Sequence, residues 1–191
     1  MTRSLSYRMD KRSKKIFQAN IKDFSNREQH WMKIYVAELE AQGKTVRVFD
    51  YGVDNSGKLI TETLKNHNAD NILIIDDKEY KIEIKTIPET SPYFTFKTFL
   101  LTQYLKQEAY ILVPRKTLYY LISPQAIKQM LLDLESKIHY SFSPNDPSVR
   151  CYPKQMNEYV SNCNIVKKEW GDKAKKLINE HAGILFKKKK I

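Results

Sequence analysis

The stretch 69–85 constrains the fold more than any other part of the chain. It reads ADNILIIDDKEYKIEIK, in which two short segments rich in apolar residues flank the polar pair Asp76-Asp77. The second segment alternates charged and apolar residues. Alternation with a period of two is typical of a half-buried β-strand, and a short polar break between two such runs is typical of a hairpin. The pattern therefore predicts two antiparallel strands joined by a tight turn.

The second predicted strand carries a glutamate and a lysine on one face. Glu83 and Lys85 are separated by a single residue, so their side chains point the same way, about 7 Å apart along the strand. The apolar residues of this strand point to the opposite face, namely Tyr80, Ile82 and Ile84. One face of the strand is therefore suited to the core and the other to polar chemistry.

The length of the turn decides whether Asp70 joins this pair. A two-residue turn at 76–77 puts Asp70 opposite Glu83, and a two-residue turn at 77–78 puts it opposite Lys85. A three-residue turn would put Asp70 on the other face. Two-residue turns also place the apolar side chains of both strands on one face. The sequence therefore favours a cluster of two carboxylates and an ammonium group.

This cluster is suited to metal-dependent hydrolysis. Two carboxylates in close proximity repel each other unless a cation lies between them, and Mg²⁺ is such a cation. We expect Asp70 and Glu83 to bind the metal and Lys85 to orient or activate a water. The alternative is an exposed strand whose outer face forms only surface ion pairs. Glu-x-Lys is common, but Asp70 at the matching offset favours the functional interpretation.

The charge balance indicates the class of partner. The 191 residues include 33 Lys and Arg against 22 Asp and Glu, a formal net charge of +11. Such a balance favours a polyanion, for which a solvated lysine-rich surface is the alternative. A nucleic acid or an anionic membrane surface fits this charge, and the candidate contacts to DNA phosphates are Lys81, Lys97, Arg115 and Lys116. An RNA-binding protein is a further alternative, although the chain lacks an RRM-type aromatic signature.

Nothing near residue 1 resembles a signal peptide, and no apolar run is long enough to span a bilayer. A cytoplasmic protein with no membrane partner is therefore expected, with Cys151 and Cys163 as free thiols. A zinc site built from these cysteines with His139 and His181 is a weak alternative, because the close spacings typical of zinc ligands are missing.

The remaining pattern predicts an α/β fold with a mixed central sheet flanked by helices. Ser25-x-x-Glu28 has the form of a capping box, which places a helix start at Ser25, and Gly43 is a natural helix stop. Strands are expected at 46–49, 109–113 and 118–122, and helices at 95–107, 123–137 and 167–180, whereas 51–68 is mostly loop and the periodicity fades after 139. The helical spacing predicts buried side chains at Phe96, Phe99, Leu100, Tyr104, Trp170, Ala174, Leu177 and Ile178. We expect a basic N-terminal arm at 1–24, a core at 25–137 and a C-terminal extension with a basic tail at 138–191, within a single domain overall.

These residues resemble the PD-(D/E)XK nuclease superfamily, which has the restriction-endonuclease-like fold. The resemblance rests on Asp70 followed by Glu83-Ile84-Lys85 in a hairpin that comes after a helix and a strand, and it covers about 25–123. Ala69 stands where the motif name has proline. The resemblance implies a Mg²⁺-dependent deoxyribonuclease, with Mn²⁺ as a possible substitute. It also implies a metal contact from the Ile84 carbonyl and a catalytic role for Lys85.

Members of the superfamily often add a carboxylate from the first helix, for which Glu28 is the candidate. Its position in the capping box gives it an alternative role at the helix start. Asp54 and Glu62 are weaker substitutes. A restriction, repair or recombination endonuclease is expected, and a homodimer is one option. A structure-specific nuclease resembling Holliday junction resolvases, or a non-catalytic DNA-binding or assembly protein on the same fold, remains an alternative.

Overall fold

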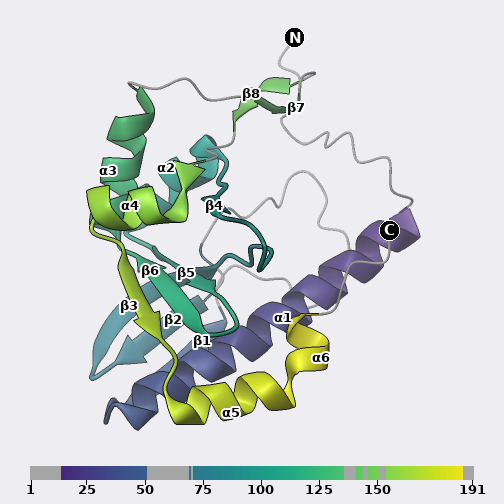
Figure 1. The fold of residues 1–191 in the computed structure, drawn as a ribbon, viewed down its shortest axis with the longest axis vertical. Helices are drawn as coiled ribbons and strands as arrows, with labels where there is room; N and C mark the ends of the chain where they lie inside the picture. Colours follow the sequence, from purple (N-terminus) through teal and green to yellow (C-terminus); the bar gives the residue numbers. More distant parts are fainter. Residues whose placement is uncertain are drawn as a thin grey trace.

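A six-stranded mixed sheet lies at the centre of the molecule (Figure 1). The computed structural model describes residues 14–50, 69, 71–135, 141–143, 146–150 and 154–186. The sheet has the strand order β1-β2-β3-β5-β6-β10. Its strands are β1 (Val46–Asp50), β2 (Asn71–Ile75), β3 (Lys78–Ile84), β5 (Tyr110–Pro114), β6 (Leu118–Ile122) and β10 (Val166–Glu169). Neighbouring strands are antiparallel except β3 and β5, which are parallel.

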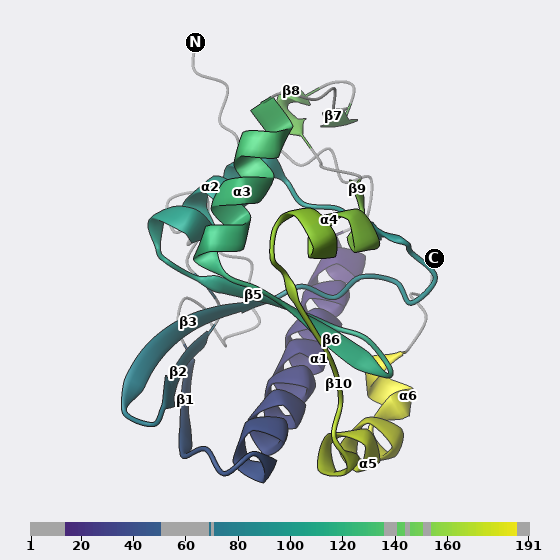
Figure 2. The same ribbon diagram turned by 60° about the vertical axis from the view of Figure 1, so that its left-hand side comes forward.

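Helices cover both faces of the sheet, as Figure 2 shows. The helices α1 (Lys14–Ala41), α5 (Asp172–Glu180) and α6 (Ala182–Leu185) lie on one side, and α2 (Thr98–Lys106), α3 (Pro124–Glu135) and α4 (Met156–Asn162) on the other. Two two-stranded sheets complete the described fold: β4 (Tyr93–Phe94) with β9 (Lys154–Gln155), and β7 (Ser141–Ser143) with β8 (Asp146–Arg150). The predicted class, a mixed sheet flanked by helices, is confirmed.

Each face of the sheet has its own apolar core, because strand side chains alternate between faces. On the α1 side, Ile82 and Ile84 of β3 pack with Trp31 and Tyr35 of α1 and with Trp170. On the α2 side, the core contains residues of α2, β5, β6, α3 and α4, including Tyr104, Ile111, Tyr120, Ile127 and Tyr159. The helix α2 connects the parallel strands β3 and β5, so it is held directly over the strand that carries Glu83.

Two predicted helix boundaries are confirmed by their hydrogen bonds. The backbone of Gly43 has φ +81°, and the N–H groups of Gly43 and Lys44 donate to the carbonyls of Glu40 and Leu39. This is the pattern of a Schellman motif, which glycine favours because it adopts a left-handed conformation without strain. Ser123 caps α3, since its hydroxyl accepts a hydrogen bond from the Ala126 N–H at 3.1 Å.

The predicted helix start at Ser25 is wrong. The first helix begins at Lys14 and runs through Ser25, so Ser25 and Glu28 are interior positions and no capping box forms there. The residues from 14 to 24 include Lys, Ile, Phe, Gln and Ala with no Gly or Pro, and they sustain a helix without a cap at Ser25. Part of the predicted arm at 1–24 is therefore helical.

The prediction for 167–180 is correct only from Asp172 onward. Residues 166–169 form β10, which pairs antiparallel with β6 at the edge of the sheet. All four side chains of β10 are exposed, so this strand has no apolar face that could reveal it in the sequence. Trp170, Ala174 and Ile178 are buried as expected. The predicted extension thus supplies a strand of the central sheet.

Smaller differences lie around α2 and beyond α3. Phe99 was an expected core residue but is 37% exposed, whereas Phe96 and Tyr104 are buried as predicted. The sequence has no clear periodicity after 139, so the short elements β7, β8, β9 and α4 were not predicted. The predicted loop at 51–68, with Asp54 and Glu62, lies outside the described residues, as do His139, Cys151 and the basic tail at 187–190.

Candidate active site on the β2–β3 hairpin

The hairpin has a two-residue turn at 76–77, which is one of the two turns that the sequence left open. Ile75 pairs with Lys78, and Asp76 and Asp77 have φ values of +49° and +64°. Positive φ at both central residues is typical of a type I′ turn, whose twist matches that of the flanking strands. This is the register for which the sequence predicts Asp70 opposite Glu83. Asp70 itself lies outside the described residues.

The first turn residue is tied to the chain before β1. The Asp76 carboxylate accepts hydrogen bonds from the Lys44 ammonium at 2.6 Å and from the Thr45 N–H at 3.1 Å. The Lys44 contact, followed by the Thr45 bond, lowers the pKa of the Asp76 carboxyl below its ordinary value. These contacts are at the surface, so they fix the turn geometry more than they stabilise the fold.

Glu83 is buried on the α2 side of the sheet. Its side chain is 7% exposed, and its strand neighbours Ile82 and Ile84 point into the core on the α1 side. The Tyr104 hydroxyl donates a hydrogen bond to Glu83 Oε1 at 2.7 Å. Burying a carboxylate is costly unless it is hydrogen-bonded, paired or bound to a metal. The burial of Glu83 and its hydrogen bond to Tyr104 argue against the alternative in which this strand face forms only surface ion pairs.

Lys85 follows directly after β3 and continues its pairing with β5. The Lys85 N–H donates to the Leu112 carbonyl at 2.9 Å, which extends the parallel ladder by one residue beyond Ile84. Alternation along the strand then puts the Lys85 side chain on the face of Glu83. Lys85 is partly buried. The predicted pair of Glu83 and Lys85 on one face therefore agrees with the backbone.

Polar side chains at the end of α2 contact strand β3 and the chain that leads into β2. Tyr104 reaches β3 through Glu83, and Gln107 Oε1 accepts a hydrogen bond from the Ala69 N–H at 3.0 Å, two residues before β2 begins. Sequence reasoning identified Tyr104 only as a core residue and gave Gln107 no role. The available signal was their spacing, because residues three apart lie on one side of a helix.

The end of α2 fixes the positions of these two side chains. The Ala109 N–H donates to the Tyr104 carbonyl at 2.9 Å and the Glu108 N–H donates to the Leu105 carbonyl at 3.1 Å. Together with φ +54° at Glu108, these bonds form a Schellman motif. Tyr104 is the third residue from the helix end, and Gln107 is the C-cap. Both are therefore set by a well-defined backbone geometry.

Glu28 lies on a different side of the sheet from Glu83. It is a partly buried residue of α1, the helix that packs against Ile82 and Ile84. Within the described residues, no three His, Cys, Asp or Glu side chains come together as a metal site. The described part of the candidate site thus contributes the carboxylate of Glu83, and a metal-binding role of Glu28 stays a prediction.

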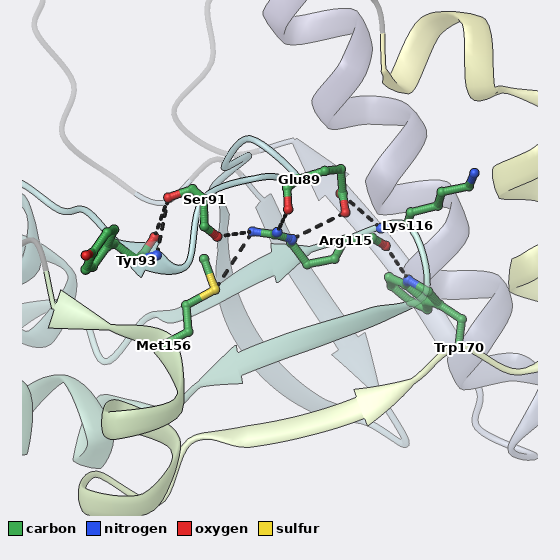
Figure 3. Close-up of polar contacts among 7 residues, drawn as sticks. All are labelled: Glu89, Ser91, Tyr93, Arg115, Lys116, Met156 and Trp170. Atoms are coloured by element: carbon green, nitrogen blue, oxygen red, sulfur yellow. Dashed lines mark hydrogen bonds and ion pairs between the residues drawn. The ribbon is translucent and has the colours of Figure 1, made fainter.

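Arg115 is engaged inside the protein rather than presented to solvent (Figure 3). Its side chain is 11% exposed, and its guanidinium donates to the carbonyls of Glu89 and Ser91. The Glu89 carboxylate lies 3.5 Å from Arg115 Nε and accepts the Lys116 N–H at 3.0 Å. The Arg115 carbonyl accepts the Trp170 indole N–H at 2.8 Å. The Arg115 guanidinium also lies 3.8 Å from Met156 Sδ of α4. These contacts support a structural role for Arg115, in which it links the 89–91 turn to the end of β5, to α4 and to Trp170 before α5.

The other predicted DNA contacts have more solvent access. Lys116 is exposed, and its ammonium points away from the Arg115 cluster in Figure 3. Lys81 lies on the same face of β3 as Glu83 and is partly exposed. Lys97 is the N-cap residue of α2 and is also partly exposed.

The structure does not assemble the weak zinc alternative from its described members. Cys163 is a buried residue of the core on the α2 side. His181 packs edge-on against His30 of α1, with ring centroids 4.8 Å apart, on the opposite side of the sheet. The two described candidates are therefore separated by the sheet.

Comparison with known proteins assigns no family. No family model matches the chain, no curated protein matches its sequence, and no solved structure gives a significant match. In the described part of the chain, none of the helices combines the length and apolar character needed to cross a membrane. The resemblance to PD-(D/E)XK nucleases stays a prediction from the sequence pattern.

Proposed function

We propose that this protein is a metal-dependent nuclease that hydrolyses phosphodiester bonds in DNA. The observation that carries the proposal is the hairpin geometry, in which a buried Glu83, oriented by the Tyr104 hydroxyl, shares a strand face with Lys85. The order of helix, strand, hairpin, helix and strand supports it, because the resemblance covers the same elements. The net charge of +11 supports a polyanionic substrate.

The residues of the candidate site fit a magnesium ion. Mg²⁺ prefers hard oxygen ligands and is bound through one or two carboxylates together with several waters. Glu83 supplies such a carboxylate, and Asp70 and the Ile84 carbonyl are the further ligands that we propose. When bound, the ion would neutralise charge on the phosphate and lower the pKa of a water. Mn²⁺ has a similar ligand preference and is expected to substitute.

The chain's own residues have separate tasks in this proposal. Glu83 holds its carboxylate in one orientation, since the strand fixes its backbone and Tyr104 fixes one oxygen. Lys85 places an ammonium group beside the carboxylate, where it can hold the attacking water or stabilise negative charge on the phosphoryl oxygens. Lys81 and Lys97 would contact phosphates along the backbone and set affinity rather than sequence choice.

Cleavage assays with defined variants test this proposal. Supercoiled, linear, single-stranded and branched DNA are incubated with Mg²⁺ or Mn²⁺, and products are followed on gels. Glu83→Gln keeps the acceptor for the Tyr104 hydroxyl but removes the charge, and Lys85→Ala removes the ammonium. Each is expected to lower cleavage by about 10²-fold or more while DNA binding persists. Lys128→Ala, at an exposed position of α3, is the matched control and should cleave like the wild type.

The outcomes separate the proposal from its main alternative. Metal-dependent cleavage that both site variants abolish supports a nuclease. Wild-type protein that binds DNA but cleaves no form of it with either metal would refute the enzyme and support a non-catalytic DNA-binding protein. A preference for branched over linear DNA would narrow the activity to a structure-specific nuclease.

A further inference from the structure

The helix α2 holds the candidate site at two points. Tyr104 donates to Glu83 Oε1 at 2.7 Å from one turn of the helix, and Gln107 accepts the Ala69 N–H at 3.0 Å from the next. The first contact spans 21 positions of sequence and the second spans 38. These bonds connect α2 to β3 and to the chain that leads into β2. A shift of α2 would therefore disturb β3 and the entry of the chain into the hairpin.

The Tyr104–Glu83 bond has more than a packing role because of where it lies. Both side chains are almost fully buried, at 4% and 7% exposure. A hydrogen bond from a hydroxyl to a buried carboxylate is strong, and it restricts rotation of the carboxyl group. Pre-set orientation of a carboxylate lowers the entropy lost when it binds a cation, and the partners that orient metal ligands commonly control affinity.

We propose that Tyr104 and Gln107 are positioning residues that tune the affinity of the candidate site for its metal. This inference rests on the proposed function, since it assigns Glu83 to a metal. Tyr104 orients the Glu83 carboxylate, and Gln107 fixes the backbone at Ala69, where the chain enters the hairpin. Neither residue needs to touch the substrate, so their loss weakens metal binding more than it slows the chemical step at saturating metal.

Tyr104→Phe tests the first contact with little disturbance of the core. The ring stays in its apolar site, and only the hydroxyl is lost. We expect the dissociation constant for Mn²⁺, measured by titration calorimetry without DNA, to rise by about 10- to 100-fold. The Mg²⁺ concentration for half-maximal cleavage should rise by a similar factor, and high metal should restore most of the maximal rate.

Two variants of Gln107 test the second contact. Gln107→Glu keeps an oxygen that can accept the Ala69 N–H, and Gln107→Leu removes it. We expect the leucine variant to bind Mn²⁺ about 10-fold more weakly than the wild type. The glutamate variant should bind Mn²⁺ within about 3-fold of the wild type. A purely structural role of Gln107 would lower the melting temperature of the leucine variant without changing metal affinity.

Tyr159→Phe is the matched control, because Tyr159 is a buried tyrosine of the same core, on α4. It should leave Mn²⁺ affinity unchanged. If the wild type binds metal and cleaves DNA but Tyr104→Phe binds metal equally well, the positioning role is refuted and the nuclease stands. If the wild type neither binds Mn²⁺ nor cleaves DNA, the proposed function itself fails.

Discussion

Glu38 joins the first helix to the last part of the chain, and its removal should cost substantial stability. It is 6% exposed on α1, and its Oε2 accepts the Gly171 N–H at 2.8 Å. Gln42 donates to its other oxygen at 2.9 Å. Gly171 is the N-cap of α5 and supplies no side-chain cap of its own. Glu38 therefore satisfies the start of α5 from a different helix.

The size of the effect follows from the type of bond. A hydrogen bond to a charged group contributes about 1.5–3 kcal/mol net, and a negative charge at a helix N-terminus adds about 0.3–1 kcal/mol. We therefore expect Glu38→Ala to lower the free energy of unfolding by about 2–3 kcal/mol. For a chain of this length, that corresponds to a melting temperature about 4–12 °C lower. Glu38→Gln keeps an acceptor and should lose about 1 kcal/mol.

Denaturant and thermal unfolding of the purified protein measure these values. Glu40→Ala is the matched control, because Glu40 pairs with Lys173 of α5 at 3.3 Å, and both side chains are about half exposed. An exposed ion pair of this kind contributes about 0.5 kcal/mol. The reasoning would be refuted if Glu38→Ala unfolded within about 0.5 kcal/mol of the wild type, or if Glu40→Ala lost as much.

Two further substitutions probe backbone strain and alkaline stability. Glu108 has φ +54° at the end of α2, so Glu108→Gly relieves a left-handed conformation and should raise the free energy of unfolding by about 0.5–1 kcal/mol in urea titrations; an equal or lower value would contradict this. Burial, followed by the neighbouring Tyr119, raises the pKa of Tyr35. The raised folded-state pKa contributes stability that is present below the unfolded-state value of about 10 and is lost as pH rises beyond it. The melting temperature, measured from about pH 8 to about pH 11, should therefore fall less steeply with pH for Tyr35→Phe than for the wild type. An equal slope in the two proteins would contradict the role of the Tyr35 hydroxyl.

The hairpin was predictable because its determinants are local. The period-two alternation and the two aspartates of the turn lie within one short stretch, and the apolar residues allow only turns that bury both strands on one face. Local signals also predicted the end of α1 at Gly43 and the start of α3 at Ser123. The failure at Ser25 has the same origin, since a capping pattern is only a local preference, and the helix continued through it from Lys14.

The contacts that complete the candidate site could not be predicted this way. Tyr104 and Glu83 meet only because α2 crosses between the parallel strands β3 and β5, which places the helix over the hairpin. The position of β10 was equally hidden, because an exposed edge strand has no apolar face and its pairing with β6 is a long-range choice. Sequence patterns report burial, whereas these features depend on which elements become neighbours.

The two faces of the sheet consequently separate stability from the proposed chemistry. On the α1 side, Glu38 and Trp170 connect α1, β10 and α5 without reaching the hairpin's polar face. On the α2 side, Tyr104 contacts Glu83 directly. A Glu38 variant should therefore lose stability while keeping its metal affinity, whereas Tyr104→Phe should bind metal more weakly. If Glu38→Ala weakened Mn²⁺ binding as much as Tyr104→Phe does, the sheet would be transmitting changes between its faces, and the assignment of separate roles would fail.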